Sequence, residues 1–309
     1  MVKLDKFTKD LGLQIIYKSK SFEKIECKSS EMNRPGLQLC GYYNQFAEDR
    51  LQIIGAAEWQ YLKDIGPDGR EKSLEKFFSR SIPAVIFTKN APVFYEVQKM
   101  AKEYDITILS TDRRTTRLIN DMVNYMDIML APKTRVHAVL MDIYGMGVLI
   151  TGDSGAGKSE TALELIEKGH KLISDDSVII RNVAGDLIGS SPEVTKHFME
   201  IRGVGIIDVE RMYGIGSVVD KKRIHLITHL EFWDENKEYE RVGMDISHVK
   251  ILDKEVAQYV IPIRPGRNTA LIIEVATKNY KQKLYGYNSA LALNERILSE
   301  INRRKEESQ

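Results

Sequence analysis

Eight consecutive residues, Gly152–Ser159, match the pattern G-x-x-x-x-G-K-[ST] of a phosphate-binding loop. The glycines let the backbone curl so that successive N–H groups point at phosphate oxygens, and the positive end of a following helix faces the same anion. Lys158 adds a mobile positive charge for the β- and γ-phosphates, and the Ser159 hydroxyl can bind Mg²⁺. The pattern therefore predicts a nucleotide site. A glycine-rich turn without a ligand is the alternative.

Three further side chains could act on a phosphate bound there. Asp175 and Asp176 close a short apolar strand soon after the loop. A carboxylate at this place could hold Mg²⁺ or accept a proton from an attacking hydroxyl, whereas an exposed pair in a turn is the alternative. His137 lies at the start of the strand that leads towards the loop, where an isolated histidine is more often structural.

Two other segments combine glycine with charge. In Met199–Asp208, glycines stand beside Glu200 and Arg202 within an apolar segment, which indicates a close approach of the backbone to another group or else a bulged strand. In Pro262–Asn268, two arginines on a Pro/Gly turn could bind a phosphate or an acidic partner, or could simply be solvated. Arg241 follows a charged segment and carries no signal by itself.

The elements around the loop are predicted from hydrophobic periodicity. A short strand, Val148–Ile150, precedes the loop, and a helix over Ser159–Lys168 follows it and ends at Gly169. A hairpin turn at Tyr144-Gly145-Met146 joins the strands Val136–Ile143 and Gly147–Thr151. The further strands expected in this half are Leu172–Ser174, Ser177–Arg181, Ile224–Glu231, Val256–Pro262 and Ala270–Ala276. An amphipathic helix, Ser289–Arg304, closes the chain, and core packing is favoured for its apolar stripe over contact with a partner.

The first half of the chain alternates strands with helices, which is typical of a mixed α/β domain. The expected strands are Leu13–Tyr17, Asp49–Gly55, Ala84–Phe87 and Ile106–Ser110. The expected helices are Lys3–Leu11, Trp59–Ile65, Leu74–Arg80, Pro92–Tyr104 and Thr115–Met129, with a strong turn at Gly66–Gly69. Ala131–Thr134 is the best linker candidate. The sequence thus predicts an α/β protein with an N-terminal mixed α/β domain, residues 1–130, and a C-terminal P-loop catalytic domain, residues 131–309, with a mostly β core and flanking helices.

Composition excludes several classes of protein. Lys and Arg number 45 against 44 Asp and Glu, for a net charge of +1, so the whole chain has no electrostatic preference for nucleic acid or anionic membrane. The apolar run Ala138–Ile150 is too short to span a bilayer, and the N-terminus lacks the apolar core of a signal peptide. Cys27 and Cys40 have no metal-site spacing, and a reduced pair is expected. We expect a soluble, cytoplasmic protein without nucleic-acid or membrane partners.

Taken together, these segments resemble the HPr kinase/phosphorylase family over essentially the whole chain. The P-loop alone is generic, but the run EIRGVGIID and the run PIRPGRN are far more specific to that family, and their order and spacing agree. The other segments that carry the resemblance are Asn33–Leu37, Val136–Ala138, Gly169–Asp176 and Arg241–Gly243.

The resemblance implies a bifunctional enzyme. Members transfer a phosphoryl group from ATP or pyrophosphate to a serine of HPr, the phosphocarrier of the sugar phosphotransferase system. They also catalyse attack of inorganic phosphate on the phosphoserine, which yields pyrophosphate, and they regulate carbon catabolite repression. The resemblance further implies Mg²⁺ as cofactor, a homo-oligomer that is typically a hexamer, and a C-terminal domain related in fold to phosphoenolpyruvate carboxykinase.

The resemblance also assigns roles residue by residue. His137, Lys158, Asp176 and Arg241 are the implied catalytic residues, with Asp176 as the base for the serine hydroxyl and as the acid in the reverse direction. Ser159 and Glu200 would hold Mg²⁺. ATP would bind Gly152, Asp153, Ser154, Gly155, Ala156, Gly157, Lys158 and Ser159. The loop that serves both directions would be Glu200, Ile201, Arg202, Gly203, Val204, Gly205, Ile206, Ile207 and Asp208. The loop that serves chiefly dephosphorylation would be Pro262, Ile263, Arg264, Pro265, Gly266 and Arg267.

Two other functions are compatible with the residues of the sequence. One is a P-loop kinase for a small molecule, with the N-terminal domain as a lid over the substrate. The other is a non-catalytic regulator that senses ATP and binds partners when loaded. The presence of Asp176, Glu200 and Arg241 argues against the regulator, because a sensor does not need groups that move a proton or stabilise a transferred phosphoryl.

Overall fold

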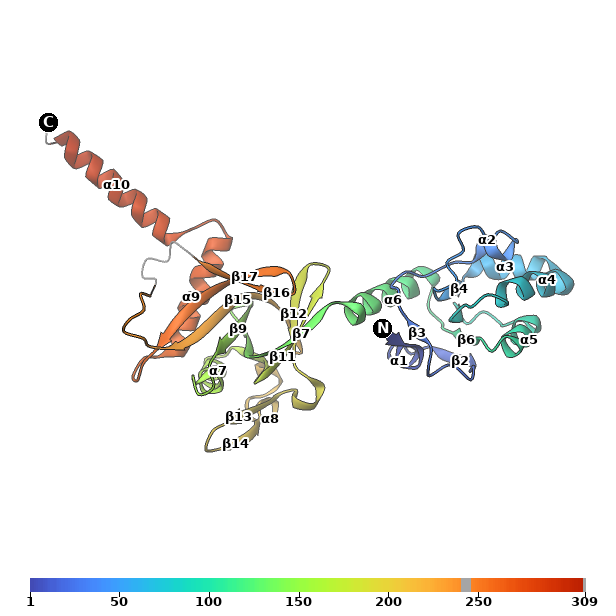
Figure 1. Ribbon diagram of the computed structural model, residues 1–309, viewed down its shortest axis with the longest axis horizontal. Coiled ribbons are helices and arrows are strands. Elements are labelled where there is room, and N and C mark those ends of the chain that lie inside the picture. The colour runs from blue at the N-terminus through green and yellow to red at the C-terminus, as the bar shows by residue number, and fades with distance from the viewer. Residues whose placement is uncertain (240–245, 308–309) are drawn as a thin grey trace. The chain divides into compact units, whose positions relative to one another are not determined.

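The computed structural model describes residues 1–239 and 246–307, with side chains up to residue 304 (Figure 1). Contacts divide the chain into two compact units, Met1–Ala131 and Pro132–Gln309. Cys27 and Cys40 are both free thiols. No helix in the described part of the chain is both long and apolar enough to cross a membrane.

The N-terminal unit is a four-stranded sheet with helices on both faces. The strand order is β2-β6-β5-β4, in which β4, β5 and β6 are parallel and β2 is antiparallel. Its strands are β2 (Gln14–Tyr17), β4 (Gln52–Ile54), β5 (Ala84–Phe87) and β6 (Thr107–Ser110), and the short β1 (Val2–Lys3) pairs with β3 (Glu26–Cys27). Its helices are α1 (Leu4–Asp10), α2 (Gly36–Leu39), α3 (Ala56–Asp64), α4 (Gly66–Phe78), α5 (Tyr95–Glu103) and α6 (Thr115–Leu130).

Alternate residues of the buried strands supply two separate cores. In β5, Ile86 packs in a cluster with residues of α1 and α6, whereas Val85 and Phe87 pack in a second cluster with residues of α3, α4 and α5. This follows from the two-residue repeat of a strand, whose successive side chains point to opposite faces. All four residues of β5 are buried, which explains why the sequence shows a continuous apolar run there.

The predicted turn at Gly66–Gly69 is wrong, because these residues form the first turn of α4. Pro67 lies within the first two helical positions, where its missing N–H would have no partner in any case. Asp68 lies in the same turn, where the positive end of the helix dipole favours a carboxylate. The residues that favour a tight turn therefore also favour a helix start.

The C-terminal unit is built on a nine-stranded mixed sheet. The path β10-β8-β9-β15-β12-β11-β7 runs across it, and β17 pairs with β15 and with β16. The bounds are β7 (Lys133–His137), β8 (Val139–Ile143), β9 (Met146–Gly152), β10 (Lys171–Ser174), β11 (Ser177–Val183), β12 (Asp186–Ser190), β15 (Lys221–Phe232), β16 (Ser247–Ile251) and β17 (Lys254–Ile263). A separate hairpin consists of β13 (Phe198–Ile201) and β14 (Gly205–Asp208).

Three neighbouring strands of this sheet, β9, β15 and β17, run parallel, so their carboxyl ends lie at one edge. Helices α7 (Lys158–Glu167) and α9 (Thr269–Leu284) contribute to a core cluster with the inward side chains of β9, and a second cluster covers the other side of the sheet. The remaining helical segments are α8 (Val209–Tyr213), α10 (Ser289–Glu307) and the short turns η1 (Glu193–Thr195) and η2 (Ile215–Ser217). The α/β fold class expected from the sequence is confirmed.

The strand predicted at Ala270–Ala276 is wrong, because this segment belongs to α9. Its isoleucines and valine favour a strand by propensity, but Asn268 caps a helix by accepting a hydrogen bond from the backbone N–H of Leu271 at 2.7 Å. The buried residues then follow helical spacing, at Ala270, Ile273, Glu274 and Thr277. Packing of this face against the sheet outweighs the local preference.

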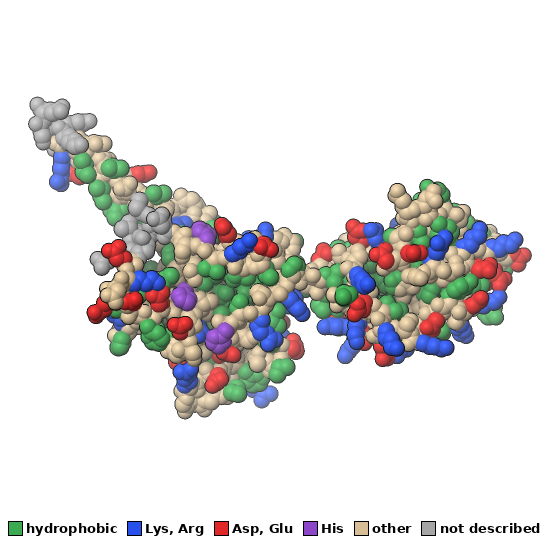
Figure 2. Space-filling model, viewed as in Figure 1, with side chains coloured by type: hydrophobic (Ala, Val, Ile, Leu, Met, Phe, Trp, Pro, Cys, Tyr) green, Lys and Arg blue, Asp and Glu red, His purple; other side chains and the backbone are tan. Residues whose placement is uncertain are grey.

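Two other expectations need correction. The predicted strand Val136–Ile143 is interrupted at Ala138, where the chain passes from β7 to β8. The apolar stripe of α10 does not pack in the core: within the described residues, Leu293 is 57% exposed and Leu298 is 51% exposed. Figure 2 shows hydrophobic side chains at the surface along this helix.

Candidate active site

The P-loop connects the carboxyl end of β9 to the start of α7, as the sequence pattern requires. Gly155 and Gly157 have φ angles of 85° and 78°, which L side chains rarely adopt. At Gly152 a Cβ atom would lie 2.4 Å from the carbonyl oxygen of Leu230 on β15, so only glycine fits there. The ammonium group of the buried Lys158 donates to the loop carbonyls of Gly152 at 2.8 Å and Asp153 at 2.9 Å. These two hydrogen bonds hold the start of the loop against the side chain of its own lysine.

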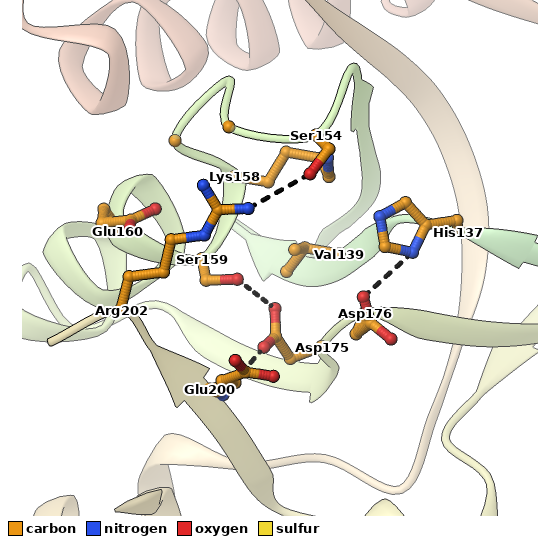
Figure 3. A pocket seen from close by; sticks show the side chains of 12 residues that line it. His137, Val139, Ser154, Lys158, Ser159, Glu160, Asp175, Asp176, Glu200 and Arg202 are labelled. Carbon is orange, nitrogen blue, oxygen red and sulfur yellow. Dashed lines mark hydrogen bonds and ion pairs between the residues drawn. The ribbon is translucent and has the colours of Figure 1, made fainter. Parts of the chain in front are cut away.

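A cavity of about 150 Å³ lies beside this loop (Figure 3). Its lining comes from the loop and α7, from the junctions between β7 and β8 and between β10 and β11, and from the β13–β14 hairpin. The lining residues are His137, Val139, Ser154, Gly155, Gly157, Lys158, Ser159, Glu160, Asp175, Asp176, Glu200 and Arg202. The cavity therefore brings together segments that are more than 60 positions apart in the sequence.

Asp175 is the buried acid of this cavity. Its carboxylate accepts a hydrogen bond from the Ser159 hydroxyl at 2.9 Å and one from the backbone N–H of Glu200 at 3.2 Å. Burial raises the pKa of Asp175, while these two hydrogen bonds act in the opposite direction. Asp175 thus joins the P-loop helix to the β13–β14 hairpin.

His137 and Asp176 lie where the chain passes from one strand to the next, from β7 to β8 and from β10 to β11. We call these two points strand crossings. β7 pairs with β11 while β8 pairs with β10, so the segment from β7 to β8 and the segment from β10 to β11 run side by side. The backbone N–H of Ala138 donates to the carbonyl oxygen of Asp176 at 3.2 Å and holds the two crossings together. As a result, His137 Nδ1 lies 2.9 Å from Asp176 Oδ1.

Asp176 has an unusual backbone conformation, with a φ angle of 63°. Aspartate tolerates this left-handed region better than most residues, and the tight turn is closed by a hydrogen bond from Ser177 N–H to the Asp175 carbonyl at 2.7 Å. The turn sends the two adjacent carboxylates in different directions: Asp175 is 5% exposed, whereas the side chain of Asp176 is 71% exposed. Asp176 therefore remains accessible to a substrate.

The segment Glu200–Asp208 forms most of the β13–β14 hairpin. Glu200 and Arg202 are its members that line the cavity, and Arg202 donates to the Ser154 hydroxyl of the P-loop at 3.1 Å. Figure 3 shows the Arg202 side chain reaching towards Ser154 and the Glu200 side chain near Asp175. Gly203 and Gly205, with φ angles of 85° and 105°, allow the tight return of the chain.

The segment Pro262–Arg267 comprises the end of β17 and the turn that follows it. None of its residues lines the cavity. It nevertheless starts at the carboxyl edge that carries the P-loop, because β15 pairs with both β9 and β17. Arg267 closes the turn by donating to the Pro262 carbonyl at 2.8 Å. Arg241 lies outside the described residues.

The oxygen groups of the cavity suit Mg²⁺. Ser159 gives its hydroxyl proton to Asp175, so the lone pairs of its oxygen face away from that bond, and Glu200 supplies a carboxylate on the same cavity. Among the described side chains no three His, Cys, Asp or Glu residues form a metal cluster. At phosphate-binding sites Mg²⁺ is usually held by one or two protein oxygens and completes its shell with water and phosphate.

Sequence reasoning named the Asp175-Asp176 pair but selected only Asp176 for a role. The signal for Asp175 was its position directly after a buried apolar strand and directly before the exposed Asp176. Which of two adjacent carboxylates turns inward depends on the strand crossing described above, and a sequence pattern does not report it.

Comparison with known proteins covers both units. Residues 2–126 match the family model described as HPr Serine kinase N terminus, and residues 128–297 match the model described as HPr Serine kinase C-terminal domain. Proteins named HPr kinase/phosphorylase align over nearly the full length. The one from Caldanaerobacter subterraneus subsp. tengcongensis is 45% identical over 301 residues, which cover 97% of this chain and 98% of that protein.

Two clostridial relatives with the same name give similar values. The protein from Clostridium acetobutylicum is 44% identical and covers 99% of this chain and 98% of its own length, and the one from Clostridium tetani is 48% identical with 91% of each chain covered. A solved structure, described as the Hpr(Ser) kinase/phosphatase from Coxiella burnetii, covers 52% of this chain and 99% of its own at 36% identity and a TM-score of 0.47. From the two family models and the full-length relatives, the chain belongs to the HPr serine kinase family.

Proposed function

We propose that this protein is an HPr kinase/phosphorylase that transfers a phosphoryl group from ATP or pyrophosphate to a serine of HPr and also catalyses phosphorolysis of phosphoseryl-HPr. The observation that carries the proposal is the position of Asp176, which shares one cavity with the P-loop and has His137 2.9 Å from its carboxylate. The full-length relatives, which bear the name HPr kinase/phosphorylase, supply the identity of the substrate.

In the forward direction, the P-loop amides and Lys158 hold the donor phosphates. Asp176 accepts the proton of the seryl hydroxyl as its oxygen attacks the terminal phosphorus, and the bond from that phosphorus to the leaving phosphate breaks. His137 orients the Asp176 carboxylate. Arg241, by resemblance to the family, stabilises the transferred group.

In the reverse direction, an oxygen of inorganic phosphate attacks the phosphorus of phosphoserine. The bond from phosphorus to the serine oxygen breaks, Asp176 returns a proton to that oxygen, and pyrophosphate leaves. The same carboxylate serves both directions because microscopic reversibility makes the forward base the reverse acid. Pro262–Arg267 serves chiefly this reverse reaction.

Ser159 and Glu200 hold Mg²⁺ in this proposal, and Asp175 positions the Ser159 hydroxyl for it. When bound, the cation supplies positive charge that neutralises the donor phosphates during transfer. Asp175 also fixes the backbone of Glu200, so one buried carboxylate orients both groups. A hexamer and a cytoplasmic location remain predictions that come from the family resemblance and from the composition of the chain.

Two assays test the proposal. Labelled ATP and purified HPr are incubated with the protein, and label on HPr supports the kinase, whereas label on a metabolite supports the small-molecule kinase. Inorganic phosphate is then added to phosphoseryl-HPr, and release of pyrophosphate supports the phosphorylase. If the protein binds nucleotide but no acceptor becomes labelled, the result supports the non-catalytic regulator that senses ATP.

A further inference from the structure

Trp233 and Arg264 lie side by side because two parallel strands end in register. β15 and β17 pair from Leu226 opposite Ala257 to Phe232 opposite Ile263. Trp233 and Arg264 directly follow the ends of β15 and β17, and the backbone N–H of Trp233 donates to the Ile263 carbonyl at 3.2 Å. The register therefore places an indole beside a guanidinium at the carboxyl edge of the sheet.

The two side chains are stacked. The guanidinium carbon of Arg264 lies 3.2 Å from the centre of the Trp233 ring, and Tyr239 packs against the same indole with ring centres 4.8 Å apart. An arginine stacked in this way uses the face of its planar group and leaves its N–H edge available for hydrogen bonds. Trp233 thus restricts the orientation of Arg264 without occupying its donors.

The donors of Arg264 have no acceptor in the part of the chain that the structure describes. The side chain is exposed, and no hydrogen bond or ion pair with a described residue engages its guanidinium. The neighbouring Arg267, in contrast, donates a hydrogen bond to the Pro262 carbonyl at 2.8 Å. An arginine that is oriented by stacking but has free donors is suited to bind an anion from solution.

The stacked pair is near the nucleotide loop. Leu230 of β15 pairs with Gly152, the first residue of the P-loop, and Glu231 pairs with Pro262. Since neighbouring strands are about 5 Å apart, the starts of the two loops are separated by about 10 Å across β15. An anion held by Arg264 at this edge would lie beside the phosphates held by the P-loop.

We propose that Trp233 is a positioning residue for phosphorolysis: its indole holds the Arg264 guanidinium by the face and presents the N–H edge to the attacking inorganic phosphate. This inference rests on the proposed function. It assigns a role to Trp233, which lies outside the segments that take part in that proposal. The ATP-driven reaction does not use free phosphate as a substrate, so Trp233 acts on one direction of the reaction.

Kinetics of the full-length protein test this role. Trp233→Leu keeps an apolar side chain but removes the aromatic face, and Trp233→Phe keeps a smaller aromatic face. For Trp233→Leu we expect the KM for inorganic phosphate in phosphorolysis to rise about 3- to 30-fold, the range of a partly desolvated cation–π contact. Trp233→Phe should stay within about 3-fold of the wild type. The kcat and the KM for ATP of the kinase reaction should change by less than about 2-fold in both.

A double variant and a spectroscopic signal separate positioning from packing. In an Arg264→Ala background, Trp233→Leu should raise the KM for phosphate no further, because the two residues act as one unit. The chain has two tryptophans, so Trp59→Phe leaves Trp233 as the single emitter. In that variant, adding Arg264→Ala should change the Trp233 emission before any phosphate is added.

The possible results distinguish a failure of the role of Trp233 from a failure of the proposed phosphorylase function. An unchanged KM for phosphate in Trp233→Leu, with normal phosphorolysis by the wild type, overturns the role of Trp233 and leaves the proposed function intact. An equal loss of kinase and phosphorolysis in the Leu and Phe variants means that Trp233 only supports the fold, which also overturns it. If the wild type releases no pyrophosphate from phosphoseryl-HPr, the phosphorylase proposal fails and this inference fails with it.

Discussion

The imidazole Nδ1 of His137 lies 2.9 Å from Oδ1 of Asp176, although the two residues belong to different strand crossings. Their side chains are 58% and 71% exposed, so both can reach a substrate in the cavity. A carboxylate that is held on one oxygen by a neighbouring ring can accept a proton on its other oxygen. This pair is therefore the centre of the proton transfer that we propose.

Replacement of Asp176 by asparagine should abolish both directions of the reaction. Asparagine keeps the size of the side chain and tolerates the left-handed backbone, but it does not accept a proton at neutral pH. Kinase and phosphorolysis rates should both fall by about 100-fold or more, whereas nucleotide affinity, measured by calorimetry, should stay within about 3-fold. Near-normal kinase turnover in this variant would show that another group is the base.

Lys158→Met tests the phosphate-binding role of the P-loop lysine. Methionine has a similar length but no charge, so the donor phosphates lose a positive partner in the transition state. We expect kcat of the kinase reaction to fall by about 100-fold or more. Far-UV circular dichroism should match the wild type, since the hydrogen bonds of Lys158 reach only loop carbonyls. Lys171→Met, at an exposed residue of β10, is the matched control and should keep full activity.

Asp175→Asn should alter the dependence on Mg²⁺ more than the affinity for HPr. Loss of the buried charge weakens the hold on the Ser159 hydroxyl and removes one of two hydrogen bonds that fix Glu200 and Ser159. The Mg²⁺ concentration for half-maximal kinase activity should rise by about 10-fold or more, the usual effect of a lost supporting group at a metal site. An unchanged Mg²⁺ profile would contradict the positioning role of Asp175.

Glu274 of α9 joins three parts of the C-terminal unit. Its carboxylate accepts hydrogen bonds from the Tyr144 hydroxyl at 2.5 Å and, with His170 as donor, from the imidazole Nε2 at 3.0 Å, and it lies 3.3 Å from the ammonium group of Lys168. Burial acts to raise the pKa of Glu274, but these partners outweigh it and lower the pKa to about 2. The hairpin turn, the end of α7 and α9 are thereby fixed to one another.

Glu274→Gln should destabilise the unit in a pH-dependent manner. Because the pKa in the folded protein is below that of the unfolded chain, the stabilisation is present above the unfolded pKa of about 4.5 and is lost as the pH falls towards 2. We expect the variant to be less stable by about 2 kcal/mol at pH 7, with the difference shrinking below about pH 4.5.

Urea denaturation followed by Trp233 emission, in a Trp59→Phe background, measures that difference in the C-terminal unit. Glu295→Gln, at an exposed residue of α10, is the matched control and should show a difference of less than about 0.5 kcal/mol at any pH. A Glu274→Gln difference that stays constant from pH 7 to pH 3 would mean that the carboxylate does not titrate as described.

The sequence by itself determined the parts of the site that are local. The P-loop residues Gly152–Ser159 needed only their own spacing and the strand and helix on either side, since the loop makes its phosphate cradle from consecutive backbone groups. The buried strands β5 and β6 were predicted nearly to the residue because short apolar runs report burial on both faces. The family resemblance, which rests on longer runs such as EIRGVGIID, supplied the substrate and the reaction.

Only the tertiary structure decided how distant residues combine. The pairing of β7 with β11 and of β8 with β10 turned Asp175 inward and Asp176 outward, and the register of β15 with β17 placed Trp233 against Arg264. Ala270–Ala276 became a helix because its buried face packs on the sheet, against its local propensity. A sequence pattern reports the period of its own segment, whereas strand pairing and burial are settled by contacts between segments that lie far apart along the chain.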